Sequence, residues 1–158
     1  MNQKDIEGRD TAWREDLRKA MTAKERADIP RAQMPMLDGD YRVTCNEEVN
    51  QGLSLEQARL EATRCLDCPN PTCVEGCPVG IHIPDFIKNI QRGDLPEAAA
   101  ILKLTSALPA VCGRVCPQEK QCESRCIYNK MKKAPVAIGY LAVSYTHLRA
   151  HETVLDLV

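Results

Sequence analysis

Eight of the nine cysteines in this 158-residue chain stand in two ordered groups. The first group has the spacing C-x2-C-x4-C-x3-C-P, and the second has the spacing C-x3-C-P-x4-C-x3-C. Thiolates at such short spacing let a tight backbone turn bring several sulfurs around one iron–sulfur cluster. The first group is Cys65, Cys68, Cys73 and Cys77, and the second is Cys112, Cys116, Cys122 and Cys126.

The proline after the fourth cysteine makes the pattern more specific. Bacterial ferredoxins end their cysteine run in C-x3-C-P, and the last cysteine of that run ligates the other cluster. Cys77-Pro78 stands in that place. The spacing therefore predicts two 4Fe–4S clusters with interleaved ligation, rather than two clusters that each take all their ligands from one cysteine group.

Structural zinc and disulfide bonds are the alternatives for so many cysteines. Zinc sites use two separated cysteine pairs, and only Cys65 and Cys68 form such a pair, so zinc leaves the cysteine-proline ends unexplained. Disulfide frameworks are typical of short secreted chains. Residues 1–7, MNQKDIE, contain no apolar signal segment. We favour iron–sulfur clusters and keep a zinc-stabilised interaction module as the second class of function.

Length and composition indicate one domain. The formal net charge of −1 gives no reason to expect nucleic acid or an acidic membrane as a partner. No apolar run is long enough to span a bilayer, so we expect a cytoplasmic protein. Aromatic residues make up 4% of the chain, which predicts a thin core that clusters help to stabilise.

Capping residues, prolines and glycines predict an all-α fold. Residues 1–28 have a weak helical pattern, with Trp13, Leu17 and Met21 four residues apart, and no segment alternates as a strand would. The other expected helices begin at Thr22, at Leu55 after the Ser54 capping box (to about Cys65), near Pro84 (to Gly93), after Asp94 (to about Leu104) and at Pro135, with short helical turns over 112–126.

Two further residues could bind metal but are not expected to. Cys45 lies far from the two groups and is interpreted as a free thiol. His82 follows the first group and imidazole can ligate iron, but eight thiols already suffice in number. We find no nucleophile, general base or oxyanion site, so no catalytic residue is predicted.

Residues 29–141 resemble the N-terminal iron–sulfur domain of the NADPH-dependent glutamate synthase small subunit. The same domain type opens dihydropyrimidine dehydrogenase and the NADPH-binding subunit of bifurcating ferredoxin:NADP oxidoreductases. The stretches that carry the resemblance are CLDC at 65–68, PTCVEGCPVGI at 71–81, LPAVCGRVCP at 108–117 and AIGYL at 137–141.

The resemblance implies an α-helical ferredoxin-like domain with two 4Fe–4S clusters. It also implies which residues ligate each cluster. The fourth ligand of the second cluster is a carboxylate or amide in the family and falls here at Ala142, so we expect that cluster to lose one iron in air. Cys112 would be a neighbour, or a substitute for the missing ligand. The implied ligands are Cys65, Cys68, Cys73 and Cys126 for the first cluster, and Cys77, Cys116 and Cys122 for the second.

The resemblance also implies a role in electron transfer. In these enzymes FAD- and NADPH-binding domains with Gly-x-Gly-x-x-Gly loops follow, and this sequence contains no such loop. The chain would then relay electrons between the NADPH-reduced flavin and the FMN of a glutamate synthase large subunit, and the hydride chemistry would lie elsewhere. The same domain of a dihydropyrimidine dehydrogenase or of a ferredoxin:NADP oxidoreductase is the alternative.

The resemblance stops at Leu141. Residues 142–158 resemble translated sequencing adapter, and we expect them to be a non-native tail that replaces the start of the downstream domains. The predicted organisation is a helical N-terminal extension over 1–28, the iron–sulfur domain over 29–141 and this tail.

Overall fold

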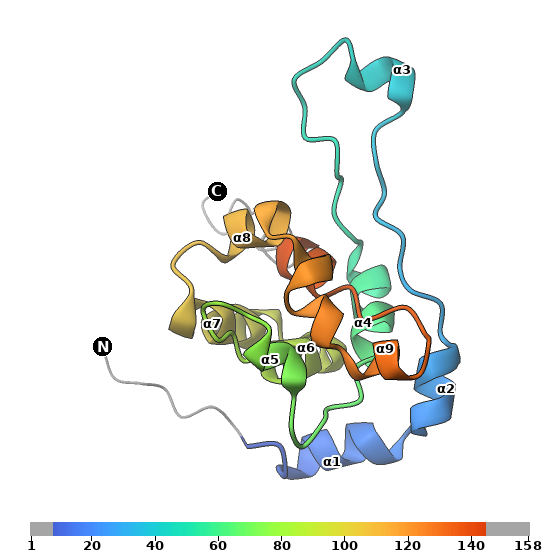
Figure 1. The fold of residues 1–158 in the computed structure, drawn as a ribbon, viewed down its shortest axis with the longest axis vertical. Helices are drawn as coiled ribbons and strands as arrows, with labels where there is room; N and C mark the ends of the chain where they lie inside the picture. Colours follow the sequence, from blue (N-terminus) through green and yellow to red (C-terminus); the bar gives the residue numbers. More distant parts are fainter. Residues whose placement is uncertain (1–7, 145–158) are drawn as a thin grey trace, which may run out of the picture.

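The computed structural model describes residues 8–144, and the regular structure among them is helical apart from one isolated bridge between Met36 and Asn50. The all-α prediction is confirmed (Figure 1). Residues 138–144 form a further helix that runs to the end of the described part. In chain order the named elements are α1 (Ala12–Lys19), α2 (Ala23–Asp28), α3 (Gly39–Arg42), α4 (Leu55–Thr63), α5 (Thr72–Glu75), α6 (Ile83–Arg92), α7 (Leu95–Thr105), α8 (Pro109–Val115), the 3-10 turns η1 (Gln118–Lys120) and η2 (Glu123–Arg125), and α9 (Ile127–Lys130).

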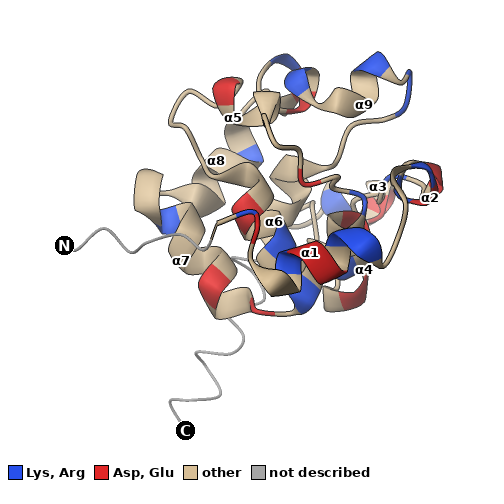
Figure 2. Ribbon diagram, turned by 90° about the horizontal axis from the view of Figure 1, so that it is seen from below, with Lys and Arg blue, Asp and Glu red and all other residues tan. Residues whose placement is uncertain are grey.

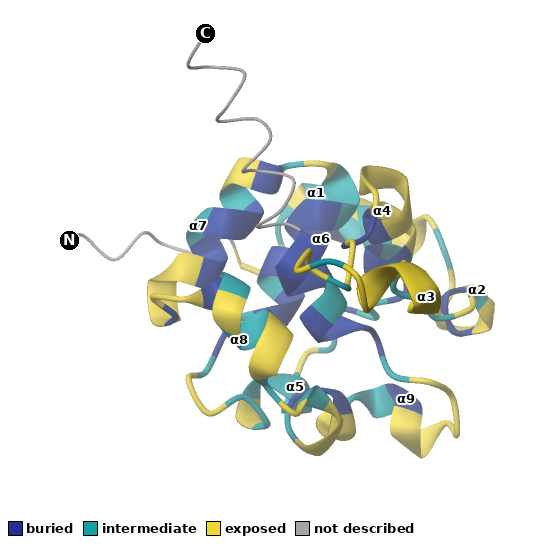
Figure 3. Ribbon diagram, turned by 90° about the horizontal axis from the view of Figure 1, so that it is seen from above, coloured by how far each residue is buried: buried dark blue, intermediate teal, exposed yellow. Residues whose placement is uncertain are grey.

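Helix α6 is the centre of the core and packs against both α4 and α7. Its apolar residues Phe86, Ile87 and Ile90 are buried. Ala98 and Ala99 of α7 are fully buried, because small side chains allow the two helices to approach closely. Figure 3 shows this buried surface gathered on α6 and α7, whereas α3 and much of α9 are exposed.

The helix caps that the sequence predicted are present in the structure. Thr22 and Ser54 each complete a capping box, at the starts of α2 and α4. The Asp94 carboxylate accepts a hydrogen bond from the Glu97 amide at the start of α7. Gly93 ends α6 with φ of 94°, a left-handed conformation that glycine adopts without a steric penalty.

One expectation about the helices was wrong, because the last helix begins at residue 138 and not at Pro135. Helix α4 ends at Thr63, with Arg64 at its C-cap, close to the expected end. In α1 the buried residue is Arg14, whereas Trp13 and Leu17 are half-buried, because an ionic contact and not an apolar stripe holds this helix on the core. The proposed tail lies outside the described residues except for 142–144.

The late start of the last helix has a visible cause in a buried carboxylate. Glu61 of α4 accepts hydrogen bonds from the main-chain amides of Ala32 (2.7 Å) and Ala137 (2.8 Å). Arg64 pairs with the same carboxylate at 2.6 Å and donates to the Ala134 carbonyl at 2.6 Å. These bonds occupy the backbone of 134–137 in an extended form, so the helix begins after them.

A second buried ionic cluster attaches α1 to the core. Arg14, which is 2% exposed, pairs with fully buried Asp67 at 2.5 Å and also with Asp85 of α6. The Trp13 ring lies 4.1 Å from the Arg92 guanidinium at the end of α6. Figure 2 shows acidic and basic residues mixed on α1, beside α4 and α6. Trp13 thus packs on this domain.

Residues 34–51, called the arm, extend away from the body with α3 at the tip (Figure 1). Two main-chain hydrogen bonds join its sides, from Leu37 to Val49 and from Gln51 to Pro35, each 2.9 Å. The carboxylate of Glu48 on the arm pairs with Arg114 of α8. The arm is therefore extended, with one short helical turn inserted at its tip.

No single helix among residues 8–144 has the length and apolar character needed to cross a membrane. Helices α7 and α8 meet that criterion when taken together, but they are bent by 81° relative to each other.

We predict that Glu61→Ala lowers the free energy of unfolding by about 3–5 kcal/mol, because it leaves Arg64 buried without its partner. Urea denaturation followed by circular dichroism measures this loss. Glu56→Ala, at an exposed position of the same helix, is the control and should change stability by less than about 0.5 kcal/mol. Equal losses in the two variants would contradict the role of Glu61.

Candidate metal centre

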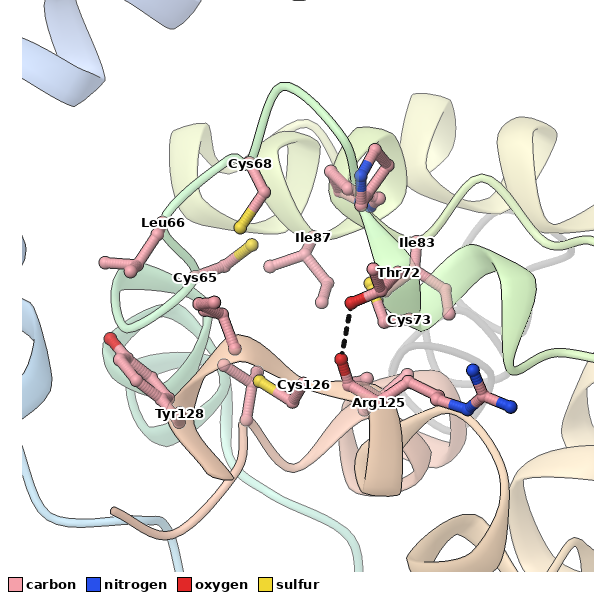
Figure 4. A pocket seen from close by; sticks show the side chains of 15 residues that line it. Cys65, Leu66, Cys68, Thr72, Cys73, Ile83, Ile87, Arg125, Cys126 and Tyr128 are labelled. Carbon is pink, nitrogen blue, oxygen red and sulfur yellow. Dashed lines mark hydrogen bonds between the residues drawn. The ribbon is translucent and has the colours of Figure 1, made fainter. Parts of the chain in front are cut away.

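Four cysteines from both groups line one cavity. Figure 4 shows the sulfurs of Cys65 and Cys68 near each other on one side, with Cys73 and Cys126 across the space that Ile87 closes from behind. The structure thus brings together the first ligand set that the family resemblance implies. We call this cavity the first site.

Short local elements position these four thiols. Cys65 and Cys68 lie in the loop after α4, Cys73 lies in α5, and Cys126 caps α9. The Thr72 hydroxyl donates to the Arg125 carbonyl at 2.6 Å and so joins the two cysteine groups beside the cavity (Figure 4). The Tyr128 hydroxyl donates to the Arg64 carbonyl, which ties α9 to the end of α4.

Asp67 shapes the loop between Cys65 and Cys68. Its φ of 53° is left-handed, which is uncommon for a residue other than glycine. Three arginines hold it there: Arg14 and Arg18 bind its carboxylate, and the Arg9 side chain donates to its carbonyl at 2.8 Å. The N-terminal segment therefore fixes the conformation of a ligand loop, which the sequence did not indicate.

The other four cysteines of the two groups line a second cavity, which we call the second site. Ala142, which is buried, is part of the same wall, as are the side chains of Gln118 and Gln121. The Ser106 hydroxyl oxygen lies 3.8 Å from the Cys112 sulfur. The four cysteines of the second site are Cys77, Cys112, Cys116 and Cys122.

Burial makes five of the eight grouped thiols hard to ionise. It raises the pKa of Cys65, Cys68 and Cys73, and the neighbouring cysteine thiolates raise the pKa further at Cys68 and Cys73. In the second site burial raises the pKa of Cys122 to about 12, and burial followed by Cys112 raises that of Cys116. Grouped thiols of this kind lose their protons when a cation binds between them.

The donor set fits an iron–sulfur cluster. Both walls are mainly apolar apart from the sulfurs, which suits a thiolate-bound cluster. No three His, Cys, Asp or Glu side chains within residues 8–144 are arranged to hold a single metal ion. A cluster lies between thiolates that are spread around a cavity, whereas zinc needs four ligands within about 2.3 Å of one ion.

Cys45 and His82 are not among the residues that line either cavity. Cys45 lies on the arm, and His82 is 42% exposed at the start of α6, with its Nδ1 3.9 Å from an Asp85 oxygen. The structure therefore does not bring these two residues to the thiols.

Two residues near the cysteines were missed by sequence reasoning. Lys88 of α6 is fully buried, and its ammonium donates to the Cys65 carbonyl at 2.6 Å. Burial lowers the pKa of Lys88, whereas the Cys65 thiolate opposes that shift. Gly76 lies where a Cβ atom would approach the Gln121 carbonyl to 2.8 Å. Neither residue stands out in the sequence, because a lysine on a helix is normally solvated and a loop glycine normally serves a turn.

Comparison with known proteins gives a family match over residues 42–153, to the family described as dihydropyrimidine dehydrogenase domain II, 4Fe-4S cluster. The chain is 45% identical over 82 residues to the glutamate synthase [NADPH] small chain of Escherichia coli (strain K12), which covers 52% of this chain and 17% of that protein. It is 38% identical over 92 residues to the Azospirillum brasilense protein of the same name, covering 58% and 19%.

A third relative has a different name. The chain is 41% identical over 95 residues to the NAD-dependent dihydropyrimidine dehydrogenase subunit PreT of Escherichia coli (strain K12), covering 60% of this chain and 23% of that protein. The chain thus spans about a fifth of the length of the curated relatives it matches.

We predict that Gly76→Ala lowers stability by about 1–3 kcal/mol, because the added methyl group overpacks the contact with Gln121 and Arg125. The steric clash should move apart the segments that carry Cys77 and Cys122, so the metal content after reconstitution should also fall. Gly39→Ala is the matched control, since a Cβ there meets nothing within 4 Å. Unchanged melting and metal content in Gly76→Ala would refute the close-contact argument.

Proposed function

Because the chain belongs to the family of dihydropyrimidine dehydrogenase domain II, a 4Fe-4S cluster domain, we propose that it relays electrons through two such clusters as part of an NADPH-dependent oxidoreductase. One observation carries this proposal: the eight grouped cysteines divide into two cavities with four thiols each. A bound 4Fe–4S cluster accepts and donates single electrons, which is the chemistry a relay needs.

The ligand assignment follows the division of the thiols. In the first site Cys65, Cys68 and Cys73 come from the first group and Cys126 from the second. In the second site Cys77 comes from the first group, and the remaining thiols come from the second. The protein's own part is to hold thiolates at fixed positions, to exclude water with apolar walls, and to keep the two sites in one rigid core around Ile83 and Ile138, which contact both cavities.

The names of the relatives support a more specific proposal. Two of them are small chains of NADPH-dependent glutamate synthase, so we propose glutamate synthesis as the process served and the FMN-containing large subunit as the partner. FAD and NADPH would bind to domains beyond the part that matches. The match to a dihydropyrimidine dehydrogenase subunit supports a pyrimidine-reducing enzyme as the alternative. Co-purification of the full-length protein with a glutamate synthase large subunit would separate the two.

The cluster proposal predicts about eight iron and eight acid-labile sulfide per chain after anaerobic reconstitution, with a brown colour. Cys73→Ser and Cys122→Ser should each disrupt one cluster and leave the other, because each removes a thiol from a different cavity. Cys45→Ser is the control and should leave both contents unchanged. Colourless protein with stoichiometric zinc would overturn the proposal in favour of a zinc-stabilised interaction module.

The second site leads to a prediction about its fourth ligand. The family position falls at Ala142, whose methyl group cannot bind iron, but Cys112 lies on the same wall as Cys116. We therefore propose Cys112 as the substitute ligand, a change from the iron loss that the sequence alone favoured. Cys112→Ser should give a 3Fe–4S signal in electron paramagnetic resonance after exposure to air, and adding Ala142→Glu should suppress it.

The parent chain serves as the comparison for that experiment. Two intact 4Fe–4S signals on reduction and no 3Fe–4S signal in air are expected from it. A 3Fe–4S signal from the parent chain that Cys112→Ser leaves unchanged would mean that Cys112 is not a ligand.

A further inference from the structure

Lys88 is a buried cation whose acceptors are neutral. Its side chain is 0% exposed, and its ammonium donates to the Cys65 carbonyl at 2.6 Å and to the Gln91 side-chain oxygen at 2.8 Å. Within residues 8–144 it forms no ion pair with a carboxylate. Burying an ammonium group without an opposite charge destabilises the folded protein. A negatively charged group that compensates Lys88 is therefore expected nearby.

The nearby carboxylates already have arginine partners. Asp67 is bound by Arg14 and Arg18, and Asp85 is bound by Arg14. Neither of these two carboxylates forms an ion pair with Lys88. Compensating negative charge for Lys88 can therefore come from the thiolates of the first site, above all from Cys65, whose main-chain carbonyl accepts its hydrogen bond.

Arg26 adds a second buried cation of the same kind. It is 3% exposed and donates to the carbonyls of Met21, Thr63 and Leu17, which are all neutral acceptors. The protein thus carries uncompensated positive charge beside the loop that begins at Cys65. That excess matches an occupant with net negative charge, and a 4Fe–4S cluster with four thiolates is a net anion.

The second site has no such arrangement. Its wall contains no Lys or Arg within the described part of the chain. The buried acidic residue next to Cys122 is Glu123, which pairs with Arg31 at 2.7 Å and accepts from the Gly139 amide. The second site therefore lacks the uncompensated buried positive charge that lies beside the first.

We propose that Lys88 is the countercation of the first site and raises the reduction potential of the cluster bound there above that of the second. The proposal rests on the cluster function proposed above. Positive charge favours the reduced cluster, because reduction adds one electron to an already anionic group. Of the two sites, the first would accept an electron more readily from a reduced flavin, and Lys88 acts as a positioning and tuning residue that does not itself bind iron.

The test compares Lys88→Met with the charge-retaining Lys88→Arg and with Lys103→Met, which removes an exposed lysine from α7. Reconstituted proteins are titrated with dithionite under electron paramagnetic resonance, and Cys122→Ser identifies the signal of the first site. Lys88→Met should lower the equilibrium constant for reduction of the first cluster at least tenfold, about 59 mV for one electron. The second cluster and Lys103→Met should not shift, and Lys88→Arg should restore most of the potential.

Stability of the metal-free protein distinguishes tuning from a purely structural role. Removing an uncompensated buried charge should leave the metal-free Lys88→Met protein as stable as the parent, or more stable, in urea. A variant with normal iron and sulfide but an unshifted first potential would overturn the role of Lys88. So would equal shifts of both clusters. If the parent chain binds no iron or sulfide, the cluster proposal fails first, and the inference fails with it.

Discussion

The buried carboxylate of Glu61 is the contact on which the rest of the fold depends. It accepts from main-chain amides at Ala32 and Ala137, which are far apart in the chain, and pairs with Arg64 directly before the first ligand loop. Asp67 and Glu123 have similar roles beside Cys68 and Cys122. A chain with few aromatic side chains thus fixes its irregular segments with buried carboxylates that are each paired with arginine. Such ionic contacts are directional, whereas apolar contacts are not.

Much of the helical framework could be predicted because its signals are local. The capping boxes at Thr22 and Ser54, the cap at Asp94 and the terminal Gly93 act within a few residues of where they stand. The buried charges could not be predicted in this way. Periodicity reports apolar faces, so it gives no signal for Arg14 or Lys88, which partners distant in sequence hold inside.

The candidate site, too, could be predicted only in those features that have a local sequence signal. Spacing identified the eight cysteines, and the family resemblance proposed how they group, but neither could say which side chains share a wall. That depends on how α5 meets η2, where Gly76 allows the Gln121 backbone to come close. Cys112 lies on the wall that Ala142 shares, so the neighbour that the resemblance implied is placed where it could serve as the substitute ligand.

The interleaving of the two cysteine groups has a consequence for how the chain is connected. Each cavity takes thiols from both groups, so two loaded clusters would act as two parallel cross-links over the segment 78–111, which contains α6 and α7. A break in the backbone between these helices would leave two pieces that metal–sulfur bonds still hold together. During synthesis the first three thiols of the first site would also have to wait for Cys126, so neither cluster could be completed before almost the whole domain had been made.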